Sequence, residues 1–277
     1  MQGRSIVSDR KRRGAATIGA TDRGARPGNG VERVRLLIDL LASEAPVSAS
    51  DAAAQTRLPL STAHKTLQEM VASRLAMFDE RRRLYSPGPE LYRLAALLTQ
   101  GGPLSIGVKQ VLRDLATAAQ ETVCLNWLNG DRTTYTVMAI EEGPGPLQYV
   151  VEPGGTLPLH AGASGRAILA YMPEPERRRY LGRRRVGRLT AETIVDGGAL
   201  KVALDQTRKQ GYAVSHGERL VGAIGIAAPV FDGQDRVVGS LQLTIPQPRF
   251  LQRRLRPLAK LVQQHATRLH GQFEGAR

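Results

Sequence analysis

The stretch SASDAAAQTRLPLSTAHKTLQEM, residues 48–70, predicts two short helices joined at a Leu-Pro corner. Ser48 stands three residues before Asp51, which is the spacing of a capping box, and the alanines that follow allow close helix packing. The second helix is predicted to bury Leu60, Ala63, Leu67, Met70 and Val71. Its opposite side carries Ser61, Thr62, His64, Lys65 and Gln68. An enzyme core has little use for such a polar face, whereas the groove of a nucleic-acid duplex does.

The residues on either side extend this helix pair into a larger module. Apolar residues between Val31 and Leu41 recur at helical spacing, which predicts a preceding helix that stops at Pro46. After the pair, RLAMFDERRRLYS (74–86) is typical of two short strands around a charged turn at 79–82. A helix, a helix-turn-helix and a β-hairpin in this order predict a winged helix-turn-helix over residues 30–88.

A winged helix-turn-helix suits DNA for physical reasons. The second helix of the pair fits a major groove, where short polar side chains and one lysine reach base edges and phosphates. The hairpin would lie across adjacent phosphates, which adds affinity but little sequence information. We therefore expect the DNA-binding residues to be Ser61, Thr62, His64, Lys65, Gln68, Arg81, Arg82 and Arg83. The alternative is an ordinary solvated surface, because exposed helices and turns commonly carry such residues.

Composition and charge agree with this prediction. The chain has 277 residues, a net charge of +14 and a pI near 10.6, so it favours polyanionic partners, and its length indicates two domains. Cys124 is the only cysteine, which fits a reducing cytoplasm. The longest uncharged stretch, 94–108, contains Gly-Gly-Pro and is too short to span a membrane, and the basic start lacks the apolar region of a signal peptide. We expect a cytoplasmic protein without membrane contact.

Two segments lie outside the predicted domains. Residues 1–29 hold seven Arg or Lys against two Asp and almost no apolar periodicity, which predicts a disordered basic tail that serves solubility or touches DNA phosphates. Residues 89–104 read as a linker helix ended by Gly-Gly-Pro. Its apolar stripe, which needs a partner in the other domain or in a second subunit, consists of Leu91, Leu94, Ala95 and Leu98.

Residues 105–277 predict helices around a mainly antiparallel sheet, which is an α+β sensor domain. Helices are expected at about 104–120, 199–211 and 249–270, and another opens near Ser164 after a glycine-rich bend. The expected strands are TVCLNWL (122–128), RTTYTVMAIE (132–141), LQYVVE (147–152), YAVSH (212–216), IGIAAPVF (224–231) and RVVGSLQLTI (236–245).

Over residues 30 to 272 the chain resembles the isocitrate lyase regulator (IclR) family of bacterial transcription factors. The resemblance rests on four strings in the family's order and spacing: LPLSTAHKTLQEM (58–70), LPLHAGASGRAILAYM (157–172), GYAVSHGE (211–218) and IAAPVFDGQDRVVGSLQLTIP (226–246). It implies an N-terminal winged helix-turn-helix and a C-terminal effector-binding domain of GAF-like (profilin-like) topology. It also implies a homodimer or homotetramer that binds a palindromic operator and responds to a small organic or aromatic acid.

The chain departs from the family pattern at four positions. Arg57 stands at the helix-turn-helix corner where glycine is usual, so we expect the turn to avoid a positive φ there. Lys65 stands where arginine is common, which exchanges a bidentate fork for a point charge. Ser215 replaces a carboxylate found in relatives that bind glyoxylate-like acids, and Gly225 replaces a polar or sulfur-bearing residue. The loss of the carboxylate at position 215 favours an aromatic or short aliphatic acid over glyoxylate.

Carried over position by position, the resemblance implies effector contacts at Ala163, Ser164, Gly165, Ser215, Gly225, Gln242 and Thr244. Leu125 and Trp127 are candidates for an apolar wall, since they share a predicted strand. Free N–H groups at the start of a helix also favour a carboxylate. The alternative is that the glycines only allow a tight turn and that Ser164 is a helix cap.

Enzymatic, cofactor and metal sites find little support in the sequence. GASGR (162–166) has arginine where a hydrolase elbow needs glycine, and no phosphate-binding loop is found. The five histidines lack metal-ligand spacing, although a pair of His160 and His216 stays open as an alternative. We expect Cys124 to be a buried apolar residue, and no enzyme activity, cofactor or metal.

Two further alternatives stay open. The arginine-rich run 177–188 is expected to be a solvated helix face and loop, or else a second contact to DNA or to another subunit. The whole protein is expected to regulate transcription in response to its effector. The alternative is an architectural DNA-binding factor whose C-terminal domain only oligomerises.

Overall fold

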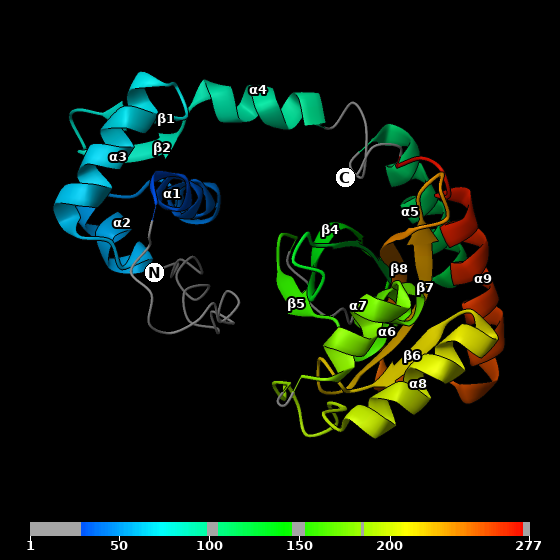
Figure 1. The fold of residues 1–277 in the computed structure, drawn as a ribbon. Helices are drawn as coiled ribbons and strands as arrows, with labels where there is room; N and C mark the ends of the chain where they lie inside the picture. The colour runs from blue at the N-terminus through cyan, green and yellow to red at the C-terminus, as the bar shows by residue number, and fades with distance from the viewer. Residues whose placement is uncertain (1–28, 99–104, 146–152, 184–185, 274–277) are drawn as a thin grey trace, which may run out of the picture.

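The computed structural model describes residues 29–98, 105–145, 153–183 and 186–273 (Figure 1). Three predictions therefore fall outside the described residues: the basic tail except for Asn29, the Gly-Gly-Pro end of the linker, and the strand at 147–152. No helix in the described ranges is long and apolar enough to cross a membrane.

The N-terminal part is a winged helix-turn-helix, as expected. Its elements are α1 (Gly30–Glu44), α2 (Ala49–Thr56), α3 (Leu60–Ala72), β1 (Ala76–Asp79) and β2 (Leu84–Pro87). The capping box at the start of α2 is confirmed, because the Ser48 side chain accepts from the Asp51 N–H while the Asp51 carboxylate accepts from the Ser48 N–H. Leu37 and Leu41 from α1 pack with Ala52, Leu67 and Tyr85 in one apolar cluster. The hairpin is antiparallel and pairs Phe78 with Tyr85.

The predicted buried side of α3 needs one correction. Leu60 is 57% exposed, whereas Thr66 is 6% exposed and lies in the interior face with Ala63, Leu67 and Met70. Leu60 is the first residue of the helix, and its Cβ precedes the turn at which the inward stripe begins. The stripe follows the 3.6-residue period through Thr66, because one short polar side chain does not interrupt it.

The corner between α2 and α3 also differs from expectation. Arg57 adopts φ 56° and ψ 27°, so the expectation that this turn avoids a positive φ is wrong. The chain must end α2 and bring Leu58, 6% exposed, into the core directly before Pro59, the N-cap of the next helix. A left-handed residue makes that sharp exit, at a cost of about 1 kcal/mol for a side chain other than glycine.

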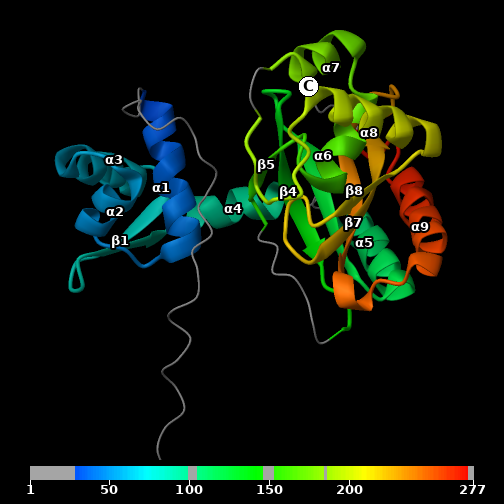
Figure 2. The ribbon, with the colours of Figure 1, turned by 90° about the horizontal axis from the view of Figure 1, so that it is seen from below.

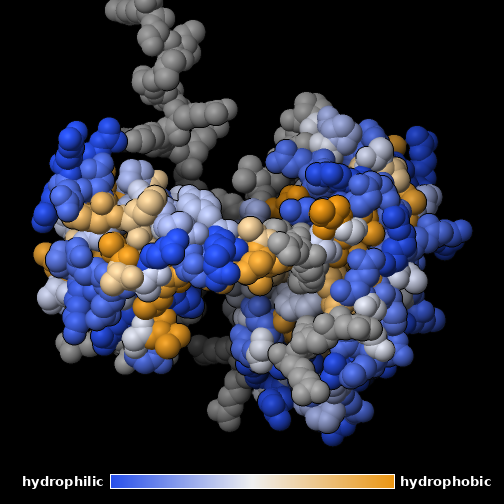
Figure 3. Space-filling view, turned by 90° about the horizontal axis from the view of Figure 1, so that it is seen from above, coloured by the Kyte–Doolittle hydropathy of each residue, from blue (hydrophilic) through white to orange (hydrophobic). Residues whose placement is uncertain are grey.

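Helix α4 (Pro89–Leu98) follows the winged helix and carries no buried residue. Leu94, Leu97 and Leu98 are 39%, 50% and 67% exposed. The predicted apolar stripe therefore exists as an exposed surface, and Figure 3 shows hydrophobic and hydrophilic surface side by side along this bridge between the two domains. What covers the stripe in the assembled protein stays a prediction.

The C-terminal part is an α+β domain built on one antiparallel sheet, in the strand order β5-β4-β3-β8-β7-β6. Its elements are α5 (Ile106–Ala119), β3 (Thr122–Leu128), β4 (Thr134–Glu141), β5 (Thr156–Pro158), α6 (Gly162–Tyr171), α7 (Glu174–Leu181), α8 (Gly197–Gln210), β6 (Ala213–His216), β7 (Ala223–Phe231), β8 (Val237–Pro246), the short 3-10 helices η2 (Gln247–Arg249) and η3 (Gln252–Arg254), and α9 (Leu255–Arg268). The α+β fold class is confirmed. The last helix begins at Leu255, later than predicted, because 3-10 turns occupy the segment before it.

The sheet separates two layers of helices (Figures 1 and 2). Helices α5 and α9 cover one face and α6 covers the other, with α8 packed beside α6. Strand β8 is buried throughout, and its alternate residues face the two layers. Leu241, Leu243 and Ile245 join the apolar layer with α5 and α9. Gln242 and Thr244 alternate with them and lie on the α6 side, where a polar site is built.

Candidate nucleic-acid interface and ligand-binding site

The outer face of α3 presents most of the predicted DNA-binding residues to solvent. Ser61, His64 and Lys65 are exposed, and Thr62 is half-buried. Gln68 is exposed as well, but its Nε2 donates a 2.8 Å hydrogen bond to the hydroxyl of Tyr85, a core residue of β2. The structure thus ties Gln68 to the hairpin and leaves the first two turns of α3 as the freest polar surface.

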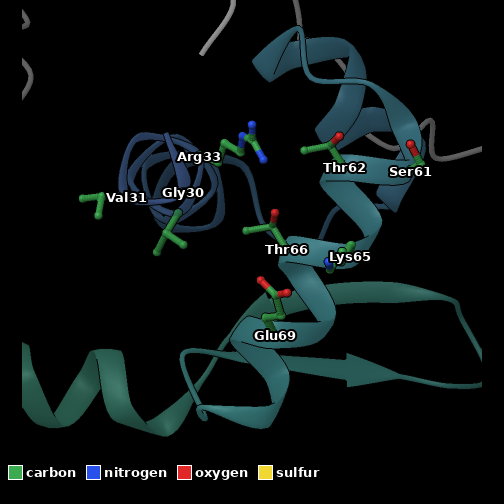
Figure 4. Close-up of a pocket in the computed structure, with 9 residues that line it drawn as sticks. Gly30, Val31, Arg33, Ser61, Thr62, Lys65, Thr66 and Glu69 are labelled. Atoms are coloured by element: carbon green, nitrogen blue, oxygen red, sulfur yellow. The ribbon is translucent and has the colours of Figure 1, made fainter. Parts of the chain in front are cut away.

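A groove of about 720 Å³ runs between α1 and α3 along this surface (Figure 4). Its lining is Gly30, Val31, Arg33, Val34, Ser61, Thr62, Lys65, Thr66 and Glu69. Figure 4 shows the Arg33 side chain reaching from α1 toward Thr62. The Arg33 Nε is buried and has no hydrogen-bond partner among the described residues. Sequence reasoning missed Arg33, because nothing in the pattern of α1 shows that its N-terminal turns lie beside α3.

The hairpin turn places its three arginines differently. Oδ1 of Asp79 accepts hydrogen bonds from the N–H groups of Arg81 and Arg82, at 2.9 and 3.1 Å, and this fixes the turn. The side chains of Arg81 and Arg82 stand in solvent, where phosphates are accessible. The Arg83 guanidinium lies 5.5 Å from the centroid of the Phe78 ring, a cation–π contact that holds it against the hairpin.

On the α6 side of the sheet, polar side chains gather in an otherwise apolar interior. We call this group the α6 polar cluster; its members, each at most 6% exposed, are Asn126, Ser164, Ser215, Gln242 and Thr244. Asn126 Nδ2 donates to Ser164 Oγ at 2.9 Å, and Gln242 Nε2 donates to Thr244 Oγ1 at 2.8 Å. The Ser164 hydroxyl and the Ser164 N–H, the latter at 3.1 Å, both donate to Oε1 of Gln242. The cluster brings together four predicted effector residues and Asn126, which was not predicted.

Helix α6 starts two residues earlier than expected, at Gly162, with Ala161 as its N-cap. Ser164 is therefore inside the first turn, and the alternative that it caps the helix is wrong. The expected free N–H at Ser164 is already bonded to Gln242. A ligand carboxylate at this helix end must take the place of a side-chain oxygen that the protein supplies itself.

Three predicted positions let α6 approach the sheet closely. A Cβ at Gly225 would stand 2.6 Å from Ser215 Oγ and 3.2 Å from the Cβ of Ala163, so the helix lies directly over β7 there. A Cβ at Gly165 would stand 2.7 Å from the backbone carbonyl carbon of Leu159. Ala163, Gly165 and Gly225 therefore fix the height of α6 above the sheet.

The prediction that Leu125 and Trp127 wall the site is wrong. Both belong to the opposite layer, where Leu125 packs in the α5 and α9 core and Trp127 contacts the ring of Phe273 at 4.9 Å between centroids. Side chains alternate along β3, so its neighbour Cys124 faces α6 instead, together with Tyr135 from β4. Burial raises the pKa of the Cys124 thiol and of the Tyr135 hydroxyl, so both are neutral, low-polarity walls.

Two arginines near the cluster were also missed. Arg166 of α6 is 4% exposed, and its guanidinium donates to the Glu218 carboxylate and to the backbone oxygen of Val214. Arg219, which follows Glu218 in the sequence, is half-buried beside the start of α6. The segment GERL (217–220) gives no periodic signal, so only the tertiary fold shows where Arg219 lies.

His160 shows why a metal site is not formed from His160 and His216. The Nε2 of His160 hydrogen-bonds the Gly187 oxygen at 2.7 Å, and the Nδ1 pairs with the Tyr180 hydroxyl at 2.9 Å, so both ring nitrogens are occupied. Burial raises the pKa of Tyr180 to about 12, which keeps its hydroxyl protonated. Across the described ranges, no group of three or more His, Cys, Asp or Glu could hold a metal ion.

Several arginines of the run 177–188 make contacts within the C-terminal domain. Arg177 Nη1 donates to the backbone oxygens of Ala170 and Met172, at 3.2 and 3.3 Å. Arg178 pairs with Glu174 within α7, and Arg183 lies over the Tyr180 ring. These contacts agree with a helix face and loop of the C-terminal domain, as the sequence predicts. A contact of this run with DNA or with another subunit stays an open alternative.

A winged helix-turn-helix joined to an α+β domain with a buried polar cluster defines a class of bacterial transcriptional regulator. Comparison with known families shows to which family of that class the chain belongs. Residues 99–270 match the family model described as the bacterial transcriptional regulator IclR C-terminal domain. The chain belongs to the IclR family of transcriptional regulators, which also agrees with the expectation that it is not an enzyme.

Relatives support the assignment over most of the chain, and solved structures share the fold. The probable transcriptional regulator SauR of Cupriavidus necator is 30% identical over 220 residues, 79% of this chain and 86% of that protein. The regulator BhcR of Paracoccus denitrificans is 29% identical over 260 residues, 94% and 92% of the two chains. An IclR regulator from Alicyclobacillus acidocaldarius has the same fold, with a TM-score of 0.76 and 24% identity over 87% of this chain and 96% of that one. A homologue from Microbacterium hydrocarbonoxydans complexed with 4-hydroxybenzoate has a TM-score of 0.70, 21% identity and coverage of 87% and 97%.

Proposed function

We propose that the protein binds a specific operator in double-stranded DNA and that a small organic or aromatic acid in the C-terminal domain changes its operator affinity. Membership of a family of transcriptional regulators, together with the exposed polar start of α3, carries this proposal. The groove beside α3 adds a second cation, Arg33, to Lys65. Two cations on one side of the reading helix favour a DNA strand, whose backbone is a regular line of phosphates.

The effector part of the proposal rests on the α6 polar cluster. Ligand sites are mostly apolar with a few convergent polar groups, and five buried polar side chains converge between α6 and the sheet. The 4-hydroxybenzoate complex of a structural neighbour indicates that this fold accepts an aromatic acid. We propose Ser164, Ser215, Gln242 and Thr244 as effector contacts, with Ala163, Gly165 and Gly225 setting the space around them.

We further propose that the protein is a dimer or tetramer on a palindromic site. The supporting observation is α4, where Leu94, Leu97 and Leu98 are exposed although they belong to an apolar helix face. A second α4 is a natural cover for such a stripe, since two-fold symmetry brings identical surfaces together. Sedimentation of the full chain gives the oligomeric state directly.

The DNA face is tested by substitution. Genomic footprinting with the purified full chain identifies the operator, and gel-shift titrations at two salt concentrations then compare variants. Lys65→Ala and Thr62→Ala should each weaken specific binding by about 1–3 kcal/mol, because each removes a contact to bases. Arg82→Ala should weaken binding to all sequences similarly and reduce the salt dependence, because it contacts phosphate.

The groove offers a matched pair of arginines as a control. Arg33→Ala should weaken DNA binding, whereas Arg35→Ala should not, because Arg35 is exposed and already paired with Asp39 at 2.5 Å. Unchanged binding in the Lys65, Thr62 and Arg82 variants would show that DNA binds elsewhere. Operator affinity that no organic acid alters would favour an architectural factor over a ligand-responsive regulator.

A further inference from the structure

The segment that runs from η2 through α9 carries basic side chains and no acidic ones. Residues 247–270 hold six Arg or Lys and no Asp or Glu. Three of the six cations have carboxylate partners. Arg249 and Arg254 both pair with the buried Glu121, at 2.6 and 3.5 Å. Arg268 pairs with a carboxylate of α5 at 2.6 Å. These three arginines hold the segment against the rest of the C-terminal domain.

The other three cations of the segment stand in solvent on one side of the helix. They are Arg253, Arg256 and Lys260, all exposed, and within the described ranges no carboxylate pairs with any of them. They follow one another at intervals of three and four residues, so they share one face. The interior face of α9 is marked by the buried Leu258 and Val262. We call the three outward cations the α9 basic stripe.

The stability of α9 does not explain where this charge lies. The helix begins at Leu255, and its first turn has Arg256 but no acidic residue. The start of a helix is the positive end of its dipole, where cations are unfavourable and anions are favourable. No side chain caps the first N–H groups of α9 either. Helix end and basic stripe therefore add to one positive potential, which attracts an anionic partner.

The uncharged residues around the stripe indicate which kind of polyanion fits. Within the described segment, Leu251 is the one large apolar side chain that is exposed, which is too little to enter a membrane. Phe250, the aromatic residue of 247–270, packs against the core and leaves no ring on which single-stranded bases could stack. The stripe spans seven residues, about 10 Å, and a strand of duplex DNA presents about three phosphates over that length. Duplex DNA therefore matches the stripe best.

We propose that the α9 basic stripe binds phosphates of duplex DNA and forms a second nucleic-acid surface, separate from the winged helix. Helix α9 belongs to the outer layer of the C-terminal domain, on the other side of the sheet from α6 (Figures 1 and 2). The stripe holds DNA outside the segment that α3 reads. Its contacts add affinity but little sequence information, because phosphates repeat along every duplex.

The experiment follows single lysines of the full chain. Acetic anhydride modifies exposed lysines, and mass spectrometry measures the rate at each position with and without a random-sequence DNA duplex at low salt. DNA should slow the acetylation of Lys260 by about tenfold, because phosphates cover its ammonium group, and added salt should restore the rate. Lys201 is the matched control, since it is exposed on α8 and pairs with Asp205 at 2.8 Å, and its rate should not change.

A double variant tests whether the stripe acts as a unit. With Arg253→Gln and Arg256→Gln, protection of Lys260 should require about tenfold more DNA, because two of the three phosphate contacts are lost. The control combines Arg35→Gln with Arg268→Gln, which removes the same charge from two arginines that already pair with carboxylates. The control should leave the DNA dependence of Lys260 unchanged. An equal shift in both double variants would trace the effect to net charge alone and overturn the proposal.

The second surface and the proposed operator binding fail separately. Lys65 on α3 should also be protected if the winged helix binds DNA. Protection of Lys65 without protection of Lys260 keeps operator binding and overturns the second surface, whereas the reverse result keeps the stripe and contradicts the reading helix. Sedimentation without DNA gives a further test, because a changed oligomeric state in the Arg253→Gln, Arg256→Gln variant would show that the stripe joins two copies of the chain. That result would also overturn the proposal.

Discussion

Among single residues, His160 has a buried environment that makes folding stability depend on pH. It is 2% exposed, and its Nε2 faces the backbone oxygen of Gly187, so this nitrogen carries the proton of the neutral ring. The Nδ1 then accepts from the Tyr180 hydroxyl. A second proton at Nδ1 would face that hydroxyl inside the protein, where burial lowers the pKa of His160 below its usual value. The environment of the His160 ring therefore favours its neutral form in the folded protein.

The expected consequence is a loss of stability in mild acid. The unfolded chain takes up a proton at His160 near pH 6.5, while the folded chain resists, so the free energy of unfolding falls as the pH drops below about 6.5. The loss ends once the pH reaches the lowered pKa of the folded state. Denaturant titrations between pH 5 and 8 should show a steeper decline for wild type than for His160→Gln. An identical pH slope in both proteins would contradict the assignment.

At the level of elements, α6 depends on a close contact with the end of β5. A methyl group at Gly165 would overlap the backbone of Leu159, which cannot move aside as a side chain can. Gly165→Ala should therefore lower the free energy of unfolding by about 1–3 kcal/mol, measured by denaturant titration. Gly130→Ala is the matched control, because nothing lies within 4 Å of that position. A similar loss in both variants would mean that the contact at Gly165 relaxes freely.

These elements also show what the sequence can and cannot predict. Helical and alternating periodicities correctly predicted the winged helix and the antiparallel strands within the described residues, and the Ser48–Asp51 spacing correctly predicted the capping box, because each depends on nearby residues. The choice of face was harder. Both faces of β3 are buried. Alternation along the strand alone therefore could not show that Leu125 faces α5 while Cys124 faces α6.

Tertiary contacts account for the other surprises. Arg57 accepts a positive φ because the chain must turn within two residues, and local propensity alone favoured a different conformation. Arg33, Asn126 and Arg219 reach their sites only through packing between elements that are distant in sequence. Their roles could be predicted only after the fold was known.

On the scale of the whole molecule, the cores of the two parts share no residue. The apolar cluster of the winged helix uses residues 37–85, and the clusters of the C-terminal part use residues 108–273. We therefore predict that a fragment from Ser105 to Arg277 folds cooperatively on its own and self-associates, as circular dichroism and sedimentation can show. An unfolded fragment would contradict the predicted boundary. A folded monomer at micromolar concentration would assign the dimer contact to α4.

The sheet order has a consequence for how the protein is made. At the centre of the sheet, β3 pairs with β8, and Thr122 lies opposite Thr244. A ribosome releases β3 early and β8 late, so the winged helix can fold while the sheet still lacks its middle partner. Until β8 arrives, the nascent chain carries an open, apolar edge on β3 that can pair with another polypeptide. Synthesis of this protein therefore has a vulnerable interval, which ends only when the last strand closes the sheet.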